Sequence, residues 1–158
     1  MSTSASDHQQ VCETVYTYAY GIDTRDWVRY RSIFAPQVAI DFTSYNPARP
    51  AATMAADSWV ASVRPLFTGL AATQHTMTNP LVQIDGDRAV CSMYMQAAHA
   101  LDHGNDDAWF TIGGHYRDTL LRTPEGWRID GVTLTVLWRR GDESIMVAAA
   151  RRGAGALQ

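Results

Sequence analysis

The fold is decided by residues 21–41, which read Gly-Ile-Asp-Thr-Arg-Asp-Trp-Val-Arg-Tyr-Arg-Ser-Ile-Phe-Ala-Pro-Gln-Val-Ala-Ile-Asp. Gly21 marks the end of one helix, and Asp23 lies at the turn that follows. A second short helix ends at Ala35-Pro36, because the residue before a proline disfavours helical backbone. The alternating residues 38–42 then predict a strand. This order places the Asp23 carboxylate at a corner, where it can point inward from a helix end.

Helical periodicity continues on both sides of this stretch. Upstream, apolar residues recur three and four positions apart between Val11 and Ile22. We expect Thr24 to cap the second helix, with its arginines, Arg25 among them, on the outer face. Downstream, Thr53 is placed to cap a third helix. The first part of the chain therefore predicts three helices and one strand.

From Ala72 onward the pattern changes from helical to extended. The expected strands are Ala72–Asn79, Leu81–Ile84, Arg88–Ala100, Trp109–Arg122 and Trp127–Arg139. Helices followed by a run of antiparallel strands predict an α+β fold with the helices packed on one face of the sheet. Strands of about thirteen residues exceed the usual three to ten, and such long strands normally curl. We therefore expect a cone-shaped domain over residues 6–140, in which a curved mixed or antiparallel sheet wraps around a pocket capped by about three helices. Residues 1–5 would be a flexible tail and residues 141–158 a partly helical one.

Composition narrows the possible partners. The 158 residues are 46% hydrophobic, which fits one domain with an ordinary core. The net charge is −3 and the charges are scattered, so neither nucleic acid nor a membrane surface is an expected partner. All 13 basic residues are arginine, which excludes Schiff-base lysine chemistry and phosphate loops that need a lysine.

Cysteine usage and hydropathy bear on the compartment. Cys12 and Cys91 show no framework spacing, so we expect reduced thiols in a cytoplasmic protein. The polar residues 1–10 do not form a secretory signal, and no apolar run approaches membrane-spanning length.

Asp23 and His75 are the strongest candidates for catalysis. His75 lies in a strand-like segment, Thr-Gln-His-Thr-Met. A carboxylate bonded to one imidazole nitrogen fixes the tautomer and raises the basicity of the other nitrogen. Such a pair can remove a proton beside a carbonyl without a metal or a nucleophile. Each residue alone also has a structural interpretation, as a helix cap for Asp23 and as an ordinary strand histidine for His75.

The odd-numbered positions of the long strand Arg88–Ala100 form an apolar face that ends in a histidine. This face contains Cys91, Met93, Met95, Ala97 and His99. Adaptable methionines suit the wall of a cavity for a hydrophobic substrate, although the same pattern also occurs in plain core packing.

The remaining histidines predict no metal site. His99 and His103 have the spacing of a helical metal pair, but their flanks are strand and loop. His115 follows Gly113-Gly114, which indicates a bulge or a close approach of the backbone rather than a phosphate-binding loop. No nucleophile elbow, paired-cysteine motif or dinucleotide fingerprint occurs in the chain, so no cofactor is expected.

Several short motifs resemble one known family. The matching residues are Asp23, Asp26, Trp27, Arg31, Ala35, Pro36, Ile40 and Asp41, then Thr73-Gln74-His75, and finally Gly126-Trp127. Together they resemble the SnoaL-like branch of the NTF2-like cone fold, whose members include scytalone dehydratase, the hexachlorocyclohexane dehydrochlorinase and polyketide cyclases; the motifs are those of scytalone dehydratase. The resemblance implies an Asp23–His75 catalytic dyad, with His99 at about the place of the family's second histidine.

The chain departs from scytalone dehydratase where that enzyme orients its substrate. Ile22 and Phe42 stand in place of two tyrosines that are thought to polarise the substrate carbonyl through water. Gly114 and Tyr116 stand where a serine and an asparagine are expected. The replacement donor is left open among Tyr16, Tyr20, Tyr45, Tyr94, Tyr116 and Arg117. The predicted substrate-binding residues are Tyr16, Tyr20, Phe42, Tyr45, Met93, Met95, Tyr116 and Arg117.

These observations favour a cofactor-independent lyase that acts on a small hydrophobic, cyclic substrate. His75 would be the general base, Asp23 would orient it, and His99 would assist as an acid at the leaving group. One alternative is an isomerase or polyketide cyclase that uses the same dyad, and another is a non-catalytic binding or assembly domain. The resemblance also implies a homo-oligomer, either a trimer or a dimer.

Overall fold

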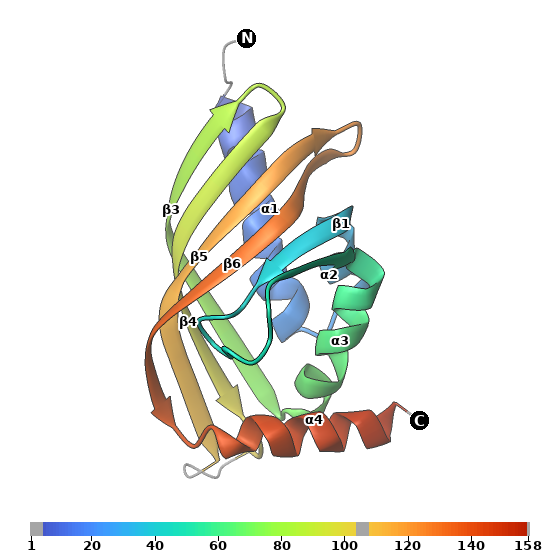
Figure 1. Cartoon of the computed structure of the whole chain (residues 1–158), viewed down its shortest axis with the longest axis vertical. Coiled ribbons are helices and arrows are strands. Elements are labelled where there is room, and N and C mark those ends of the chain that lie inside the picture. The colour runs from blue at the N-terminus through green and yellow to red at the C-terminus, as the bar shows by residue number, and fades with distance from the viewer. Residues whose placement is uncertain (1–4, 104–107, 158) are drawn as a thin grey trace.

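The structure is a computed structural model that describes residues 5–103 and 108–157. The helices in these ranges are α1 (Ala5–Asp23), α2 (Trp27–Ser32), α3 (Ala56–Gly69) and α4 (Ser144–Ala156). The strands are β1 (Phe34–Asp41), β2 (Ala52–Ala55), β3 (Ala72–Asp85), β4 (Arg88–Ala100), β5 (Trp109–Thr123) and β6 (Gly126–Gly141) (Figure 1). Most of the expected N-terminal tail lies outside the described residues, whereas Ala5 already belongs to α1.

The strands form one curved, six-stranded sheet in the order β2-β1-β6-β5-β4-β3. Strands β3 to β6 pair antiparallel with their neighbours, while β1 runs parallel to β6. Figure 1 shows the long strands bending together, with α3 beside the sheet and α4 crossing its lower end. The predicted α+β architecture with a curved mixed sheet is therefore confirmed.

The boundary between α2 and β1 differs from the prediction. Helix α2 ends at Ser32, and Phe34 already pairs with Ile129 of β6, so Ala35-Pro36 are strand residues rather than a helix end. The register of this pairing shifts between Phe34 and Ala39, and Pro36 lies inside that irregular segment. Proline cannot donate to a sheet ladder, so an irregular segment is where a strand tolerates it. Pairing with β6 thus outweighs the helical periodicity.

The helix caps also differ from the prediction. Asp26, not Thr24, caps α2 through a hydrogen bond from the backbone N–H of Arg29 at 3.0 Å. Thr53 belongs to β2 and does not cap α3. The residue before α3 is Ala55, whose side chain makes no capping hydrogen bond. Arg25 lies between two helices with a φ of +59°, outside the helical region where it was expected.

The pairing of the long strands β3 to β6 is interrupted by three register shifts, of which one lies between β3 and β4 and two lie between β5 and β6. Strand β3 runs through Asn79-Pro80 with a register shift, so the two expected strands are one. The pairing of β5 with β6 also shifts between Gly113 and Gly114, where the extra residue is Leu137 of β6, opposite the glycines. A Cβ on Gly114 would lie 1.9 Å from the carbonyl oxygen of Thr135, so only glycine permits this close approach of β5 and β6.

The C-terminal tail is part of the fold. Helix α4 packs against α3, and a Cβ on Gly153 would lie 1.8 Å from the carbonyl oxygen of Pro65. Ile145 and Ala149 of α4 are buried at the same contact. Helix α4 thereby closes the lower end of the cone. None of the helices in the described ranges is both long and apolar enough to cross a membrane.

Asp118 is a buried carboxyl in an otherwise mainly apolar core. It lies on β5 opposite Cys91 of β4 and Val132 of β6, and none of its surface is exposed. Neither carboxyl oxygen has a hydrogen-bond partner among the residues that the structure describes. Burial raises the pKa of Asp118 to about 8, because an apolar interior disfavours the charged form. The fold therefore favours the protonated acid.

This burial predicts a stability that depends on pH. Between the unfolded pKa near 4 and the folded pKa of about 8, the folded state keeps a proton that the unfolded state releases. The free energy of unfolding therefore falls as pH rises through this window, by at most about 1.4 kcal/mol per pH unit. In Asp118→Asn this contribution is absent. Chemical denaturation of both proteins from pH 5 to 8 should show the variant gaining stability relative to the native protein as pH rises.

The control for this prediction is Asp85→Asn, which removes an exposed carboxylate at the β3–β4 turn. It should leave the pH dependence of unfolding unchanged. A stability difference between Asp118→Asn and the native protein that stays constant from pH 5 to 8 would show that Asp118 is charged in the fold.

Candidate active site

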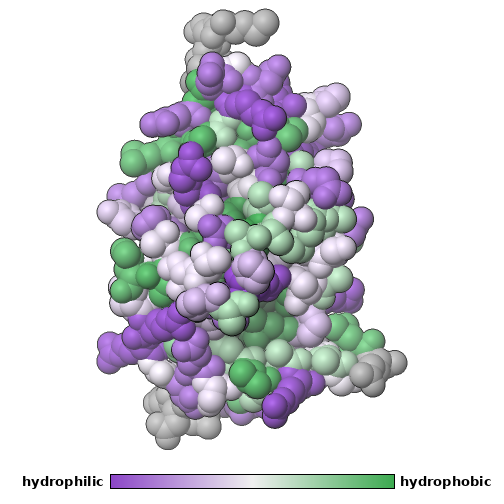
Figure 2. All heavy atoms as spheres, viewed as in Figure 1, coloured by the Kyte–Doolittle hydropathy of each residue, from purple (hydrophilic) through white to green (hydrophobic). Residues whose placement is uncertain are grey.

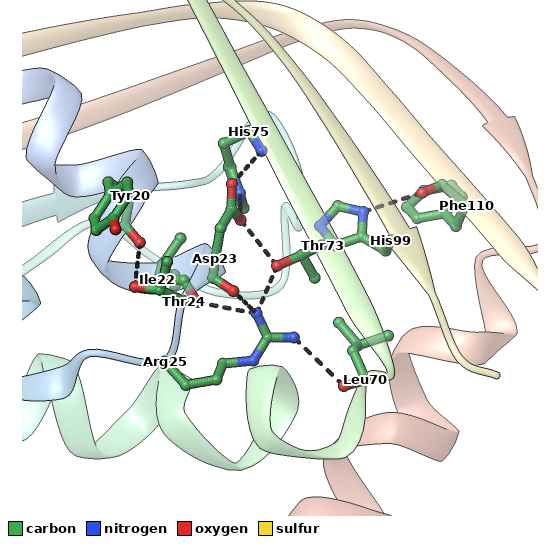
Figure 3. Close-up of polar contacts among 10 residues, drawn as sticks. All are labelled: Tyr20, Ile22, Asp23, Thr24, Arg25, Leu70, Thr73, His75, His99 and Phe110. Carbon is green, nitrogen blue, oxygen red and sulfur yellow. Dashed lines mark hydrogen bonds and ion pairs between the residues drawn. The ribbon is translucent and has the colours of Figure 1, made fainter. Parts of the chain in front are cut away.

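Asp23 and His75 form a hydrogen-bonded pair between α1 and β3. Asp23 is the last residue of α1, and its Oδ1 lies 2.7 Å from His75 Nδ1. The backbone N–H of His75 donates to Asp23 Oδ2 over 2.6 Å, so both carboxylate oxygens contact the same residue (Figure 3). The His75 side chain is only 4% exposed and that of Asp23 18%. The sequence motifs that suggested this pair thus lie together in space.

Thr73 and Arg25 hold the Asp23 carboxylate in place. Thr73 stands two residues before His75, on the same face of β3, and its hydroxyl donates to Asp23 Oδ1 over 2.8 Å. Arg25 donates to Thr73 Oγ1 at 2.8 Å and to the backbone carbonyl oxygens of Asp23 and Leu70 at 2.7 and 3.4 Å. Figure 3 shows the guanidinium spanning the end of α1 and the start of β3. Arg25 therefore points inward, although the sequence predicted an outward side chain.

These bonds determine the charge and tautomer of the pair. Partial burial acts to raise the pKa of Asp23, but the hydrogen bonds from His75 and Thr73 outweigh burial and lower it. Asp23 is therefore an ionised acceptor. Because it accepts from His75 Nδ1, the neutral ring keeps its lone pair on Nε2. The free nitrogen of His75 is the basic one.

His99 lies next to His75 but in a different state. The two rings are nearly perpendicular, with centroids 5.9 Å apart, and Phe67 contacts both. His99 Nδ1 lies 3.0 Å from the carbonyl oxygen of Phe110, which can only accept, so Nδ1 carries the proton. Burial, with His75 as a second cause, lowers the pKa of His99 to about 4. His99 is therefore neutral at physiological pH, and its Nε2 is a hydrogen-bond acceptor.

Both histidines line a cavity of about 170 Å³. Besides β3 and β4, which carry the histidines, its walls come from α1, the β1–β2 loop, α3, β5, β6 and α4, and they are mostly apolar or aromatic. The polar lining residues besides the histidines are Tyr18, Tyr45, Asn46, Arg49, Ser62 and Tyr116. Figure 2 shows hydrophobic atoms recessed near the centre of this face, above α4. The volume is below the roughly 300–1,000 Å³ of common ligand pockets, so it suits a compact ligand.

A group of phenols forms one wall of this cavity. The ring of Tyr18 lies 5.1 Å from that of Tyr30 and 5.5 Å from that of Tyr116, and its hydroxyl makes polar contacts with both of their hydroxyls. Trp59 donates its indole N–H to the Tyr30 hydroxyl over 3.1 Å. Burial raises the pKa of all three phenols, so each is a neutral hydrogen-bond donor. Tyr18 and Tyr116 are the two that line the cavity.

The structure separates the predicted substrate-binding residues into two groups. Phe42, Tyr45 and Tyr116 line the cavity with the histidines. The others do not: Met93 and Met95 are buried in the core, Tyr16 and Tyr20 lie in a shallow outer depression, and exposed Arg117 borders a groove near β1. Of the odd-numbered residues of β4, only His99 lines the cavity, because the methionines pack beneath the helices.

The other histidines lie away from the cavity. His103 is exposed in the turn after β4, and His115 is half-buried on β5, opposite exposed Tyr94. No cluster of three potential metal ligands occurs in residues 5–103 and 108–157.

Sequence reasoning gave no functional role to several residues that line the cavity or hold the dyad. Tyr18 occupies the inner face of α1, and its signal was its position three residues after Val15 and four before Ile22. Thr73 could have been found from its spacing of two from His75 on a strand, since alternate strand residues share a face. Arg25 and Arg49 gave no such signal, because loop geometry places them.

The family comparison agrees with this geometry. Residues 3–133 match the model of the SnoaL-like domain, so the chain belongs to this family. Among curated proteins, it is 27% identical over 151 residues to the dehydratase cfoI of Aspergillus candidus, covering 87% of this chain and 86% of that one. A dehydratase-like enzyme is the function that these relatives support.

Solved structures share the fold. The protein Kfla4162 of Kribbella flavida is 27% identical with a TM-score of 0.81, over 92% of this chain and 97% of that one. A protein of Novosphingobium aromaticivorans, provisionally assigned as a scytalone dehydratase, is 15% identical with a TM-score of 0.74, over 87% and 89% of the two chains. The hexachlorocyclohexane dehydrochlorinase LinA Type2 is 14% identical with a TM-score of 0.70, over 85% and 88%. The resemblance to the NTF2-like cone fold is confirmed.

The Arg25 contacts predict a measurable loss of stability. Arg25→Ala removes bonds to Thr73 and to backbone carbonyls and leaves a side chain at a φ of +59°. We expect the free energy of unfolding to fall by about 1–3 kcal/mol. Arg25→Gly loses the same bonds but tolerates the positive φ, so it should be the less damaging by up to about 1 kcal/mol. Denaturant unfolding of both variants tests this order, and an unchanged Arg25→Ala would contradict it.

Proposed function

We propose that this protein removes water from a small, ring-containing hydroxy ketone by general acid–base catalysis, without a cofactor. The observation that carries the proposal is the His75 ring, bound at Nδ1 by ionised Asp23 and lining a mostly apolar cavity. An oriented imidazole has no evident use in a cavity that only binds a ligand. The dehydratase among its relatives supports the same reaction class.

The first step is removal of a proton from the carbon beside the carbonyl. His75 Nε2 accepts this proton, and the C–H electron pair forms an enolate with the carbonyl. Asp23 stabilises the imidazolium that results and does not itself take the proton. General base catalysis of this kind contributes roughly 10²–10⁴-fold, so orientation in the cavity must contribute the remainder.

The second step is loss of the hydroxyl group on the next carbon. The enolate electrons form the new C=C bond as the C–O bond breaks, and the departing oxygen takes a proton to leave as water. His75 now carries the proton it removed and can supply it. The acid role predicted for His99 does not fit its neutral state with Nδ1 bound to Phe110. We assign His99 the role of accepting a hydrogen bond from the substrate hydroxyl at Nε2.

The phenol wall supplies donors for the substrate carbonyl. The chain resembles scytalone dehydratase around the dyad, but it has Ile22 and Phe42 where that enzyme has two tyrosines. Tyr18 and Tyr116 offer neutral hydroxyls in the same cavity. A hydroxyl donor near a developing enolate oxygen stabilises its charge. Because the Tyr18 and Tyr116 hydroxyls contact each other and each has one O–H, at most one of the two can donate to the substrate at a time. We assign this shared donor the role of the missing phenols.

The proposal predicts turnover of 3-hydroxy-1-tetralone, a two-ring hydroxy ketone that loses water to give 1-naphthol. His75→Ala should lower kcat/KM for this probe by roughly 10²–10⁴-fold, because the proton acceptor is lost. Asp23→Asn should also lower it, because the amide does not stabilise the imidazolium. Formation of 1-naphthol can be followed by its fluorescence.

The matched control is His115→Ala, which removes a histidine from β5 outside the cavity. It should retain native activity, and thermal unfolding should show that all three variants fold. Undiminished activity in both His75→Ala and Asp23→Asn would refute the dyad. A product of unchanged mass would instead indicate an isomerase or cyclase, and saturable binding without any product would indicate a binding domain.

A further inference from the structure

The cavity carries a positive charge in a chain that is negative overall. The net charge of the protein is −3, yet the described lining residues include one formal cation, Arg49, and no carboxylate. Asp23 bonds to the Nδ1 side of the His75 ring and is not among the residues that line this cavity. The field inside the cavity therefore favours a ligand with negative charge.

Arg49 lies on the aromatic wall of the cavity. Its guanidinium carbon is 5.5 Å from the centroid of the Trp59 ring, within the range of a cation–π contact. Trp59 is 1% exposed, donates its N–H to Tyr30 and packs edge-on against Phe42 with centroids 5.4 Å apart. The ring beneath the guanidinium is therefore fixed, and it restricts where the guanidinium lies.

The Arg49 guanidinium forms no ion pair with an acid in the part of the chain that the structure describes. Asn46 lies three residues before Arg49, and its Oδ1 accepts a hydrogen bond of 3.0 Å from the backbone N–H of Ala48. This bond orients the side-chain amide and leaves its NH₂ group available as a donor. Both side chains line the cavity. A planar guanidinium and an amide NH₂ that line the same cavity are suitable donors for a carboxylate.

The cavity thus has two chemically different regions. His75, His99 and Phe67 form one cluster of rings, with centroids 5.8 to 6.2 Å apart. Arg49 and Trp59 belong to the other region, which the β1–β2 loop and α3 supply. A ligand that fills the cavity contacts both. Its volume of about 170 Å³ suits one or two rings, since an apolar cavity of about 150 Å³ accepts benzene.

We propose that the natural ligand is a compact ring-bearing carboxylic acid, with its carboxylate on Arg49 and Asn46 and its ring on Trp59 and Phe42. The opposite end of the ligand then faces His75. For the reaction, this assignment rests on the proposed function and narrows the substrate to a hydroxy ketone that also carries an acid group. The binding itself requires no turnover.

A matched pair of probes tests the assignment. The acid probe is 2-naphthoate, and the neutral probe is methyl 2-naphthyl ketone, which has a similar shape. Isothermal titration calorimetry should give tighter binding of the acid by the native protein. Arg49→Gln should weaken 2-naphthoate about three- to tenfold, a modest factor because Arg49 is exposed to solvent. The same variant should leave the ketone affinity unchanged.

Two controls separate the explanations. Arg117→Gln makes the same change in net charge outside the cavity and should leave both affinities unchanged. Arg49→Lys keeps the charge without the planar fork, so it should recover part of the loss. Equal affinities of the native protein for the two probes, or equal losses for both in Arg49→Gln, would overturn the proposal.

The outcome is independent of the catalytic proposal. His75→Ala alters the other end of the cavity, so it should change the affinities for 2-naphthoate and the ketone alike and keep the preference for the acid, because His75 does not contact the carboxylate in this assignment. If Arg49→Gln shows the selective loss while His75→Ala retains full dehydratase activity, the acid site stands and the dyad fails. If His75→Ala is inactive and Arg49→Gln shows no selective loss, the dyad stands and the acid site fails.

Discussion

The hydrogen bond between His75 Nδ1 and Asp23 is the interaction on which the site depends. It joins the last residue of α1 to β3, two elements that meet only because the sheet curves around the helices. Thr73 and Arg25 bond to the same junction, so the carboxylate, the imidazole and the first turn after α1 are fixed together. This contact positions the His75 ring beside His99 and fixes which of its nitrogens is free. The chemistry we propose follows from that choice of tautomer.

The two inward-facing aspartates show what partners do to a carboxyl group. Asp23 accepts bonds from His75 and Thr73, and these lower its pKa despite partial burial. Asp118 has no partner among the described residues, and burial alone raises its pKa to about 8. Residue type is the same in both places, so the difference comes from their surroundings: Asp23 is partly exposed and hydrogen-bonded beside His75, whereas Asp118 is fully buried without a described partner. One aspartate is suited to stabilise an imidazolium, and the other is an uncharged member of the core.

Local patterns predicted much of the fold and the pair at its centre. The α+β architecture, the long strands and the close approach of the backbone at Gly113-Gly114 followed from periodicity and glycine placement, and short motifs identified Asp23 and His75. The α2–β1 boundary did not follow, since Pro36 reads as a helix end until β6 pairs beside it. The inward turn of Arg25 and the place of Arg49 also depend on loop geometry, which no periodic pattern encodes. Met93 and Met95 share the face of His99, but only the full curvature of the sheet decides which of them reaches the cavity.

The central claim is that His75 removes a proton from carbon inside this cavity. The most direct measurement is deuterium incorporation at C2 of 1-tetralone in heavy water, followed by mass spectrometry, because this ketone has no leaving group. The account predicts that the native protein accelerates exchange, that His75→Ala reduces it to the uncatalysed rate, and that His115→Ala retains it. Exchange by His75→Ala at the native rate would contradict the claim and place the base elsewhere.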